Sequence, residues 1–220
     1  MQAQDFETYA EIKPFNFAVA PTWRAVADEV ISRLDRDLEN IKVLDYGCGD
    51  GKYYPFFVER GLPASNIHGL EVSSKRLERC REIGWENTRL LEPGRPLPFA
   101  EESFDLINCM EVIEHIPALD GERAIAELRR LLRPGGFLMI STPNYPIKRF
   151  YDIYDAFFLR DWRRLRDDPT HVTMFNEKKL RVLLERNFAG VERRDFKPGF
   201  LYKRLGTSWS LHKLFFLCRA

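Results

Sequence analysis

The sequence predicts an α/β fold of the doubly wound type, in which a parallel sheet carries helices on both faces. Strand-like and helix-like segments alternate from residue 21 to about residue 144, a rhythm typical of parallel sheets with helical crossovers. A turn rich in glycine, from Gly47 to Gly51, follows the first strand. The chain has 220 residues, of which 45% are hydrophobic. It is long enough to bury one core, and we expect a single domain over residues 1–220.

Each element has its own signal in the sequence. A helix is expected from Pro21 as far as Leu38, because Pro21 suits a first helical turn and apolar residues recur after it at helical spacing. Ser73 or Ser74 would cap another helix, and Gly84 would end it. Strands are expected within residues 41–47, 66–73, 87–92, 103–111, 135–144, 190–196 and 212–220. Further helices are expected within residues 52–60, 74–84, 121–136 and 176–188.

The alternation breaks after the fifth strand. Residues 145–175 are longer than an ordinary connection and rich in aromatic and basic residues. We expect this lid-like insert to contain a helix and to lie near the end of the sheet that binds ligands. It is either a lid over the substrate, with a preference for anionic or membrane-borne substrates, or an amphipathic helix with a solvated basic face. Acidic residues in the same segment dilute the charge and favour the second interpretation.

Charge and cysteine content argue against several classes of protein. The formal net charge is +1, so the chain lacks the overall basic character of proteins that bind nucleic acid. The four cysteines are scattered and form no Cys-x-x-Cys pair. This argues against a zinc site or a disulfide framework and favours a reducing, cytoplasmic location. The first residues lack the pattern of a signal peptide, and no apolar run is long enough to span a bilayer.

The stretch VLDYGCGDG, Val43 to Gly51, indicates a cofactor site. In open α/β sheets, ligands bind beyond the carboxyl ends of the strands, where glycines let a ligand approach the backbone. A dinucleotide fingerprint requires G-x-G-x-x-G, but the glycines here are spaced G-x-G-x-G. Asp45 precedes them, and its carboxylate would repel phosphates but attract an ammonium or a sulfonium. We therefore expect S-adenosylmethionine rather than a dinucleotide.

Glu71 closes the second predicted strand, 20 residues after Gly51. An acid at that place can accept hydrogen bonds from the hydroxyl groups of a ribose. A carboxylate at a strand end is common by itself and is often only solvated. Its position relative to the glycine turn favours the role in binding a ribose.

Five stretches follow one another in an order and spacing that are highly specific. They are VLDYGCGDG, GLEVS, LPFAEESFDLINCMEVIEHI, LRRLLRPGGFLMISTPN and DPTHVTMF, within about residues 41 to 190. Through them the sequence resembles the class I S-adenosylmethionine-dependent methyltransferases. The resemblance implies a Rossmann-like, seven-stranded sheet that is mostly parallel, with the last strand, residues 212–220, antiparallel.

The resemblance also implies which residues bind the cofactor. They are Asp45, Gly47, Cys48, Gly49, Gly51, Glu71, Val72, Glu92, Pro93, Cys109 and Met110. The glycine turn would hold the methionine part, Glu71 the ribose, and Val72 would lie against the adenine. Glu92 and Pro93 stand where the family has further adenine contacts, although the family acid is often Asp and the segment EPGRP is unusually rigid. Cys109 and Met110 would line the floor of the site.

Methyl transfer to oxygen usually needs a base for the hydroxyl proton. The catalytic candidates are His171, Glu111 and His115. His171 either lies over the transferred methyl group as a base or hydrogen bonds to backbone and pins the insert, and both roles stay open. Glu111 and His115 lie four residues apart in MEVIEH, where an ordinary role at the end of a strand competes with catalysis. We predict no metal, because these residues on one turn, with Glu114 between them, lack a third strong ligand.

We predict a methyltransferase that uses S-adenosylmethionine and releases S-adenosylhomocysteine. The acceptor is expected to be a small molecule or a glycan- or lipid-linked metabolite, methylated at oxygen, because CMEVIEHIP and THVTMF resemble segments of the ubiquinone-biosynthesis O-methyltransferases. The alternative is a non-catalytic or regulatory protein that binds S-adenosylmethionine, similar to MetW. A nucleic-acid methyltransferase is disfavoured, because NCMEV lacks the Asn/Asp-Pro-Pro-aromatic motif. Peripheral membrane contact and the oligomeric state stay open.

Overall fold

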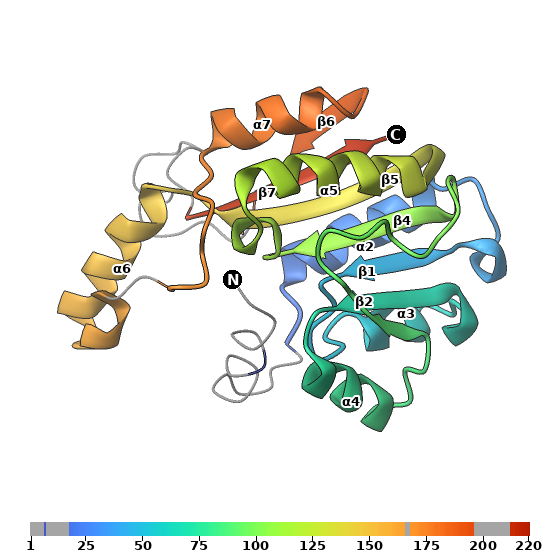
Figure 1. The fold of residues 1–220 in the computed structure, drawn as a ribbon, viewed down its shortest axis with the longest axis horizontal. Coiled ribbons are helices and arrows are strands. Elements are labelled where there is room, and N and C mark those ends of the chain that lie inside the picture. The colour runs from blue at the N-terminus through green and yellow to red at the C-terminus, as the bar shows by residue number, and fades with distance from the viewer. Residues whose placement is uncertain (1–6, 8–17, 166–167, 196–211) are drawn as a thin grey trace.

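The computed structural model describes residue 7 and residues 18–165, 168–195 and 212–220. Positions 166–167 of the predicted insert therefore lie outside the described residues. Within the described residues, seven strands form one sheet in the order β3-β2-β1-β4-β5-β7-β6 (Figure 1). The strands are β1 Val43–Tyr46, β2 Ile67–Glu71, β3 Thr88–Leu90, β4 Phe104–Met110, β5 Leu132–Pro143, β6 Gly190–Arg193 and β7 Lys213–Arg219.

The strand directions confirm the predicted fold class. Neighbouring strands from β3 to β5 pair in parallel. Strand β7 pairs antiparallel with both β5 and β6, so it is the one strand of this sheet that runs against the others. The carboxyl ends of β1, β2, β4 and β5 consequently meet at one edge of the sheet, where the glycine turn and Glu71 lie.

Helices cover both faces of the sheet (Figure 1). They are α2 Pro21–Arg33, α3 Tyr54–Glu59, α4 Ser74–Glu82, α5 Ala118–Leu131, α6 Ile147–Phe158 and α7 Glu177–Glu185, with short 3-10 turns η1 Leu38–Asn40, η2 Ala64–Asn66, η3 Ile113–His115 and η4 Trp162–Leu165. Apolar residues of α2, α3 and α4 form one core with the sheet, and those of α5 and α7 form a second core on the opposite face. Burial on both faces explains why the strands read as continuous apolar runs.

The first helix is shorter than its apolar spacing predicted. It ends at Arg33, because Leu34 adopts an extended conformation with φ −75° and ψ 106°. Leu38 lies in η1 and is 40% exposed, so its four-residue spacing from Leu34 does not reflect a continuous helix. Between them, Arg36 turns toward β4, where its Nε lies 3.1 Å from Oδ1 of the buried Asp105. This ion pair holds the chain against the sheet where the sequence pattern alone would have continued the helix.

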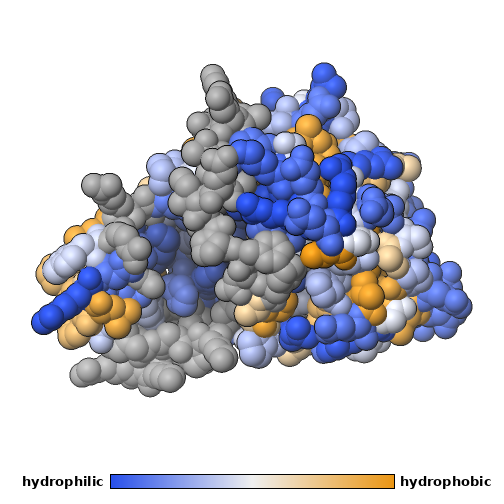
Figure 2. Space-filling model, turned by 90° about the horizontal axis from the view of Figure 1, so that it is seen from below, coloured by the Kyte–Doolittle hydropathy of each residue, from blue (hydrophilic) through white to orange (hydrophobic). Residues whose placement is uncertain are grey.

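The predicted insert contains α6 and η4, which lie at the edge of the sheet that carries the strand carboxyl ends (Figure 1). Hydrophobic side chains gather at the end of the molecule formed by α6 (Figure 2). Phe157, Phe158 and Leu159 are 60%, 70% and 64% exposed there. The expected helix is therefore confirmed, whereas closure of the insert over a substrate stays a prediction. Within the described part of the chain, no helix combines the length and apolar character required to cross a bilayer.

Candidate functional site

The turn after β1 has a backbone conformation that favours glycine at three positions. Gly47, Gly49 and Gly51 have φ values of 75°, 56° and 84°, a backbone region that residues with a Cβ rarely adopt. A Cβ at Gly47 would overlap Val112, and one at Gly51 would lie 2.8 Å from the Ile83 side chain. The turn thus leaves its backbone bare at the carboxyl end of β1, as close approach of a ligand requires.

Asp45, the next-to-last residue of β1, is oriented by two side chains that are distant in sequence. Asn108 Nδ2 donates to Asp45 Oδ1 at 2.7 Å, and Trp23 Nε1 donates to Asn108 Oδ1 at 2.9 Å. Asp45 is 2% exposed, and its Oδ2 has no hydrogen-bond partner within the described structure. Burial, opposed by the Asn108 hydrogen bond and reinforced by the charge of Glu71, raises the pKa of Asp45 to about 7. A buried acceptor without a partner is costly unless a ligand supplies the donor.

Glu71 ties the glycine turn to the end of β2. Its Oε2 accepts the amide of Gly49 at 2.9 Å, and its Oε1 accepts the amides of Val72 and Ser73 at 2.9 and 3.0 Å. Burial raises the pKa of the Glu71 carboxyl, although these hydrogen bonds and Arg76 oppose the shift. The carboxylate therefore keeps acceptor capacity at Oε2, on the side that faces the glycine turn.

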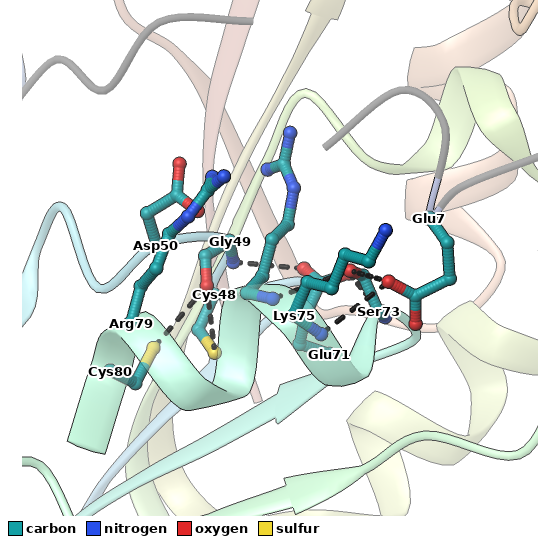
Figure 3. A network of polar contacts seen from close by, with 10 residues as sticks. Glu7, Cys48, Gly49, Asp50, Glu71, Ser73, Lys75, Arg79 and Cys80 are labelled. Atoms are coloured by element: carbon teal, nitrogen blue, oxygen red, sulfur yellow. Dashed lines mark hydrogen bonds and ion pairs between the residues drawn. The ribbon is translucent and has the colours of Figure 1, made fainter. Parts of the chain in front are cut away.

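Glu7 reaches the same place from the N-terminal part of the chain (Figure 3). Its carboxylate accepts from Ser73 Oγ at 2.8 Å and from the Ser74 amide at 2.6 Å. These donors belong to the first turn of α4, where Ser73 also caps the helix by accepting from the Arg76 amide. An acid at this position stabilises the positive end of the helix dipole, directly beside Glu71.

The structure separates the predicted floor residues. Met110 belongs to the core beneath α2 and α3, on the face of Asp45 and Asn108, whereas Cys109 packs in the core beneath α5 and α7. This follows from the alternation of side chains along β4. The Cys48 thiol is likewise buried, in the first core. Cys48 and Cys109 can therefore contribute backbone atoms to the site but not their thiols.

The predicted adenine contacts lie at the rim. Val72 is half-buried, beside Glu71, but Glu92 and Pro93 are exposed in the turn after β3. The Glu92 carboxylate pairs with Arg95 Nη1 at 2.7 Å rather than joining the polar network of Glu71. Their adenine role stays a prediction that no observed contact supports.

Glu111, the first residue after β4, is held by β5 and β7. Its backbone has a φ of 58°, and its carboxylate accepts from Ser141 Oγ at 2.7 Å and from Lys213 Nζ at 2.8 Å. Burial alone would raise the pKa of Glu111, but Lys213 and Ser141 outweigh it and hold the pKa below its ordinary value. An ion-paired carboxylate of this kind is a weak proton acceptor.

His115 and His171 meet at the carboxyl end of β4 although 55 residues separate them. Their ring centroids lie 4.9 Å apart. His115 Nδ1 lies 3.0 Å from the Thr170 carbonyl, which can only accept, so this nitrogen carries the hydrogen. His171 Nδ1 lies 2.8 Å from Tyr145 Oη, and His171 Nε2 lies 4.0 Å from Asp168 Oδ2. The His115 ring thus hydrogen bonds to the backbone of Thr170, whereas the His171 ring contacts the side chain of Tyr145.

Glu114 lies between the catalytic candidates Glu111 and His115 in the sequence, and its side chain is buried. It is 1% exposed, and neither carboxylate oxygen has a hydrogen-bond partner within the described residues. Burial and the nearby charge of Glu111 raise the pKa of Glu114 to about 8. Glu114, His115 and His171 each place one donor atom within 4.8 Å of the others. His171, which lies in another part of the chain, thus brings a third donor atom beside the turn that carries Glu114 and His115.

Several residues of the site escaped the sequence analysis. Trp23 and Asn108 orient Asp45, Lys213 and Ser141 hold Glu111, Tyr145 contacts His171, and Glu7 caps α4. None belongs to a local motif, since the two partners of each contact lie 26 or more positions apart in sequence. Only the topology brings them to one edge of the sheet.

The residues present fit S-adenosylmethionine. The unpartnered Asp45 oxygen suits an ammonium group, the turn around Gly47 and Gly49 allows close approach of a flexible chain, and Glu71 offers an acceptor to a hydroxyl group. Two adjacent acids would disfavour the pyrophosphate of a dinucleotide at the same place.

Comparisons with known proteins identify the family of the chain. A family model described as a methyltransferase domain matches residues 20–192. A ubiquinone biosynthesis O-methyltransferase from Leptothrix cholodnii is 32% identical over 125 residues, which are 51% of this chain and 48% of that protein. Another, from Bordetella avium, is 29% identical over 156 residues, which are 68% of this chain and 60% of that protein. The matched part thus spans about half of each relative.

A solved structure adds the fold. A SAM-dependent methyltransferase from Archaeoglobus fulgidus has a TM-score of 0.67 at 16% identity, over 90% of this chain and 93% of that one. At such identity the likeness concerns the fold alone, and the fold agrees with the sheet order found here. The family match covers more than half of the chain, and the chain therefore belongs to the class I S-adenosylmethionine-dependent methyltransferases.

Proposed function

We propose that the protein transfers the methyl group of S-adenosylmethionine to a hydroxyl oxygen of a small-molecule acceptor. The observation that carries the proposal is the buried, unpartnered Oδ2 of Asp45 beside the glycine turn. Asp45 would bind the ammonium of the methionine part, Glu71 a ribose hydroxyl, and Val72 the adenine. The relatives named as O-methyltransferases support oxygen as the acceptor atom.

The cofactor supplies an electrophilic methyl group, so the protein must align the acceptor and remove its proton. Of the three catalytic candidates, Glu111 is the weakest base, because Lys213 holds it ionised. We assign the base to His171. For its Nε2 to accept a proton, Nδ1 must carry the hydrogen and donate it to Tyr145 Oη. His115 would stand beside it and fix the segment through Thr170.

The exposed apolar residues at the end of α6 indicate what kind of molecule the acceptor is beyond its hydroxyl group. Phe157, Phe158 and Leu159, at the end of α6, are exposed, and α6 lies toward the edge of the sheet where the strand carboxyl ends meet (Figure 1). This supports an acceptor with a hydrophobic part, such as a lipid-linked metabolite, and peripheral contact with a membrane. The four cysteines are free thiols, which supports the reducing, cytoplasmic location.

The cofactor assignment is tested by calorimetric titration with S-adenosylhomocysteine, with NAD as the control ligand. We expect binding of the former alone. Asp45→Ala and Glu71→Ala should each weaken that binding about tenfold, which is about 1.4 kcal/mol. Unchanged affinity for S-adenosylhomocysteine in both folded variants would contradict the cofactor assignment.

The base is tested with His171→Ala. We expect turnover of an accepted phenol or alcohol to fall while the affinity for S-adenosylhomocysteine holds. A variant that loses its thermal unfolding transition would instead assign His171 a structural role. Cofactor binding without turnover of any acceptor by the wild-type chain would favour the non-catalytic, MetW-like alternative.

A further inference from the structure

Helix α6 turns its charged side toward the protein and its apolar side away from it. Lys148, Asp152 and Ala156 recur every fourth residue and so share one face of the helix. On that face Ala156 is fully buried, and the side chains of Lys148 and Asp152 are 19% and 17% exposed. Phe150 and Ile153 lie on the other side of the helix and are 50% and 45% exposed. This is the reverse of the burial that an ordinary surface helix shows.

The exposed apolar residues form a continuous row, which we call the α6 stripe and which consists of Phe150, Ile153, Phe157 and Trp162. The first three follow one another at spacings of three and four residues, which places them on one face of α6. Trp162, in η4, extends the row, because its ring lies edge-on to that of Phe157 with 5.2 Å between the centroids. Arg149 Nη2 donates to the Leu165 carbonyl at 2.9 Å and ties η4 to the helix. The stripe is therefore one connected surface.

The basic residues of α6 are paired with an acid on the buried side of the helix. Lys148 Nζ lies 2.7 Å and Arg149 Nη1 lies 3.3 Å from Oδ2 of Asp152. A helix that binds an anionic membrane presents lysines and arginines beside its apolar face, where they reach the lipid phosphates. The core of a protein–protein interface is instead rich in aromatic side chains and poor in charge. The composition of the α6 stripe is therefore that of a protein interface.

The size of the α6 stripe suits a dimer. A whole aromatic side chain presents about 150–250 Å², so at their exposed fractions the four residues together leave roughly 400 Å² of apolar surface. A stable interface buries about 800 Å² on each partner, of which roughly 57% is apolar. The stripe thus supplies most of the apolar area that one half of such an interface requires.

We propose that the α6 stripe is the interface of a homodimer, in which α6 packs antiparallel against α6 of a second copy of this chain. The two-fold axis passes beside Ile153, which lies three residues after Phe150 and four residues before Phe157. Phe150 of each copy then meets Phe157 of the other, so one self-complementary patch is covered on both copies. Phe158 and Leu159, considered above for contact with a membrane, are not part of the stripe. The inference does not depend on the cofactor or the acceptor of the proposed function.

Sedimentation equilibrium of the full chain tests the dimer. At micromolar concentration we expect twice the mass of one chain. Ile153→Lys places two ammonium groups face to face at the two-fold axis, so it should raise the dissociation constant about a hundredfold, which is about 2.8 kcal/mol. Its thermal unfolding transition should stay unchanged, because Ile153 is already half-exposed. Val182→Lys, at a residue of α7 that is 41% exposed, is the matched control and should stay dimeric.

A pair of opposite charges tests the antiparallel arrangement. Phe150→Glu and Phe157→Lys should each dissociate the dimer when introduced alone. A chain that carries both substitutions should recover the dimer at low salt, because each introduced carboxylate then faces an introduced ammonium of the other copy. In a parallel arrangement like charges would meet, and the double variant would stay monomeric.

Four outcomes would overturn the proposal. A monomeric wild-type chain excludes the dimer, and a dimer that survives Ile153→Lys has its interface elsewhere. A monomer that sediments with phosphatidylcholine vesicles, and no longer does so with Ile153→Lys, assigns the stripe to a membrane. Loss of the thermal transition in both Ile153→Lys and Phe157→Lys assigns the stripe to a contact within one chain. None of these measurements involves S-adenosylhomocysteine, so each outcome leaves the proposed function to its own test.

Discussion

Asn108 donates a hydrogen bond of 2.7 Å to one carboxylate oxygen of Asp45 and leaves the other oxygen buried without a partner. Trp23 in turn fixes the orientation of the Asn108 amide, so residues of the core determine which Asp45 oxygen is left without a partner. Asp45, the acid proposed to bind the cofactor, is thus positioned by residues of the core.

Removal of the Asn108 side-chain amide should impair cofactor binding indirectly, through its effect on Asp45. We expect Asn108→Ala to weaken binding of S-adenosylhomocysteine about tenfold at neutral pH, because Asp45 loses a donor that favours its ionised form. Asn40→Ala, in the exposed turn η1, is the control. Calorimetry that shows equal affinities for both variants would contradict the relay from Trp23 through Asn108.

Cofactor affinity should rise with pH through neutrality. Burial raises the pKa of Asp45 to about 7, and an ammonium ligand favours the ionised carboxylate. Binding should therefore strengthen from about pH 6 to about pH 8, with release of about one proton per site at the lower pH. Titration in two buffers of different ionisation enthalpy measures that proton. Asp45→Asn should bind weakly with no such release, and a pH-independent wild type would argue against Asp45 as the ammonium site.

Tyr145 should act on catalysis through His171. We expect Tyr145→Phe to lower kcat about tenfold and to shift the pH profile of kcat, because Nδ1 of His171 loses its partner at 2.8 Å. Affinity for S-adenosylhomocysteine should hold. Tyr54→Phe, whose hydroxyl contacts the Gly84 carbonyl at 3.4 Å, is the matched variant. If both variants lower kcat alike with an unchanged pH profile, the Tyr145 contact has only a packing role.

Chelation should leave activity unchanged. Glu114, His115 and His171 lie close enough to share an ion, but burial and the charge of Glu111 raise the pKa of Glu114 to about 8. Its carboxyl is then mostly protonated at neutral pH and is a poor ligand. We expect full turnover after treatment with EDTA and its removal. Loss of turnover that zinc or magnesium restores would instead make this cluster a metal site.

The order of strands and helices was predictable, and so was the position of Asp45 and Glu71 at the carboxyl ends of their strands, because these signals are local. Asp45 and Gly47 lie within three residues of one another, and Glu71 ends its own strand. The early end of α2 was not predictable, because the ion pair between Arg36 and Asp105 joins segments far apart in sequence.

Side-chain direction was predictable in part. The alternation along β4 places Asn108 and Met110 on one face and Cys109 on the other, and applying it to the sequence would have excluded the Cys109 thiol from the floor. No local signal points to Lys213 as the partner of Glu111, since they lie 102 positions apart. The same holds for the meeting of His115 and His171, which depends on how residues 168–175 return to the end of β4.

The contact of Glu7 with the first turn of α4 has a practical consequence. A recombinant chain that starts after this residue, or that carries a bulky tag in front of it, alters the cap of a helix that begins three residues beyond Glu71. The starting residue chosen for expression is therefore an experimental variable, and affinities for adenosine-containing ligands are comparable only between chains that share the same N-terminus.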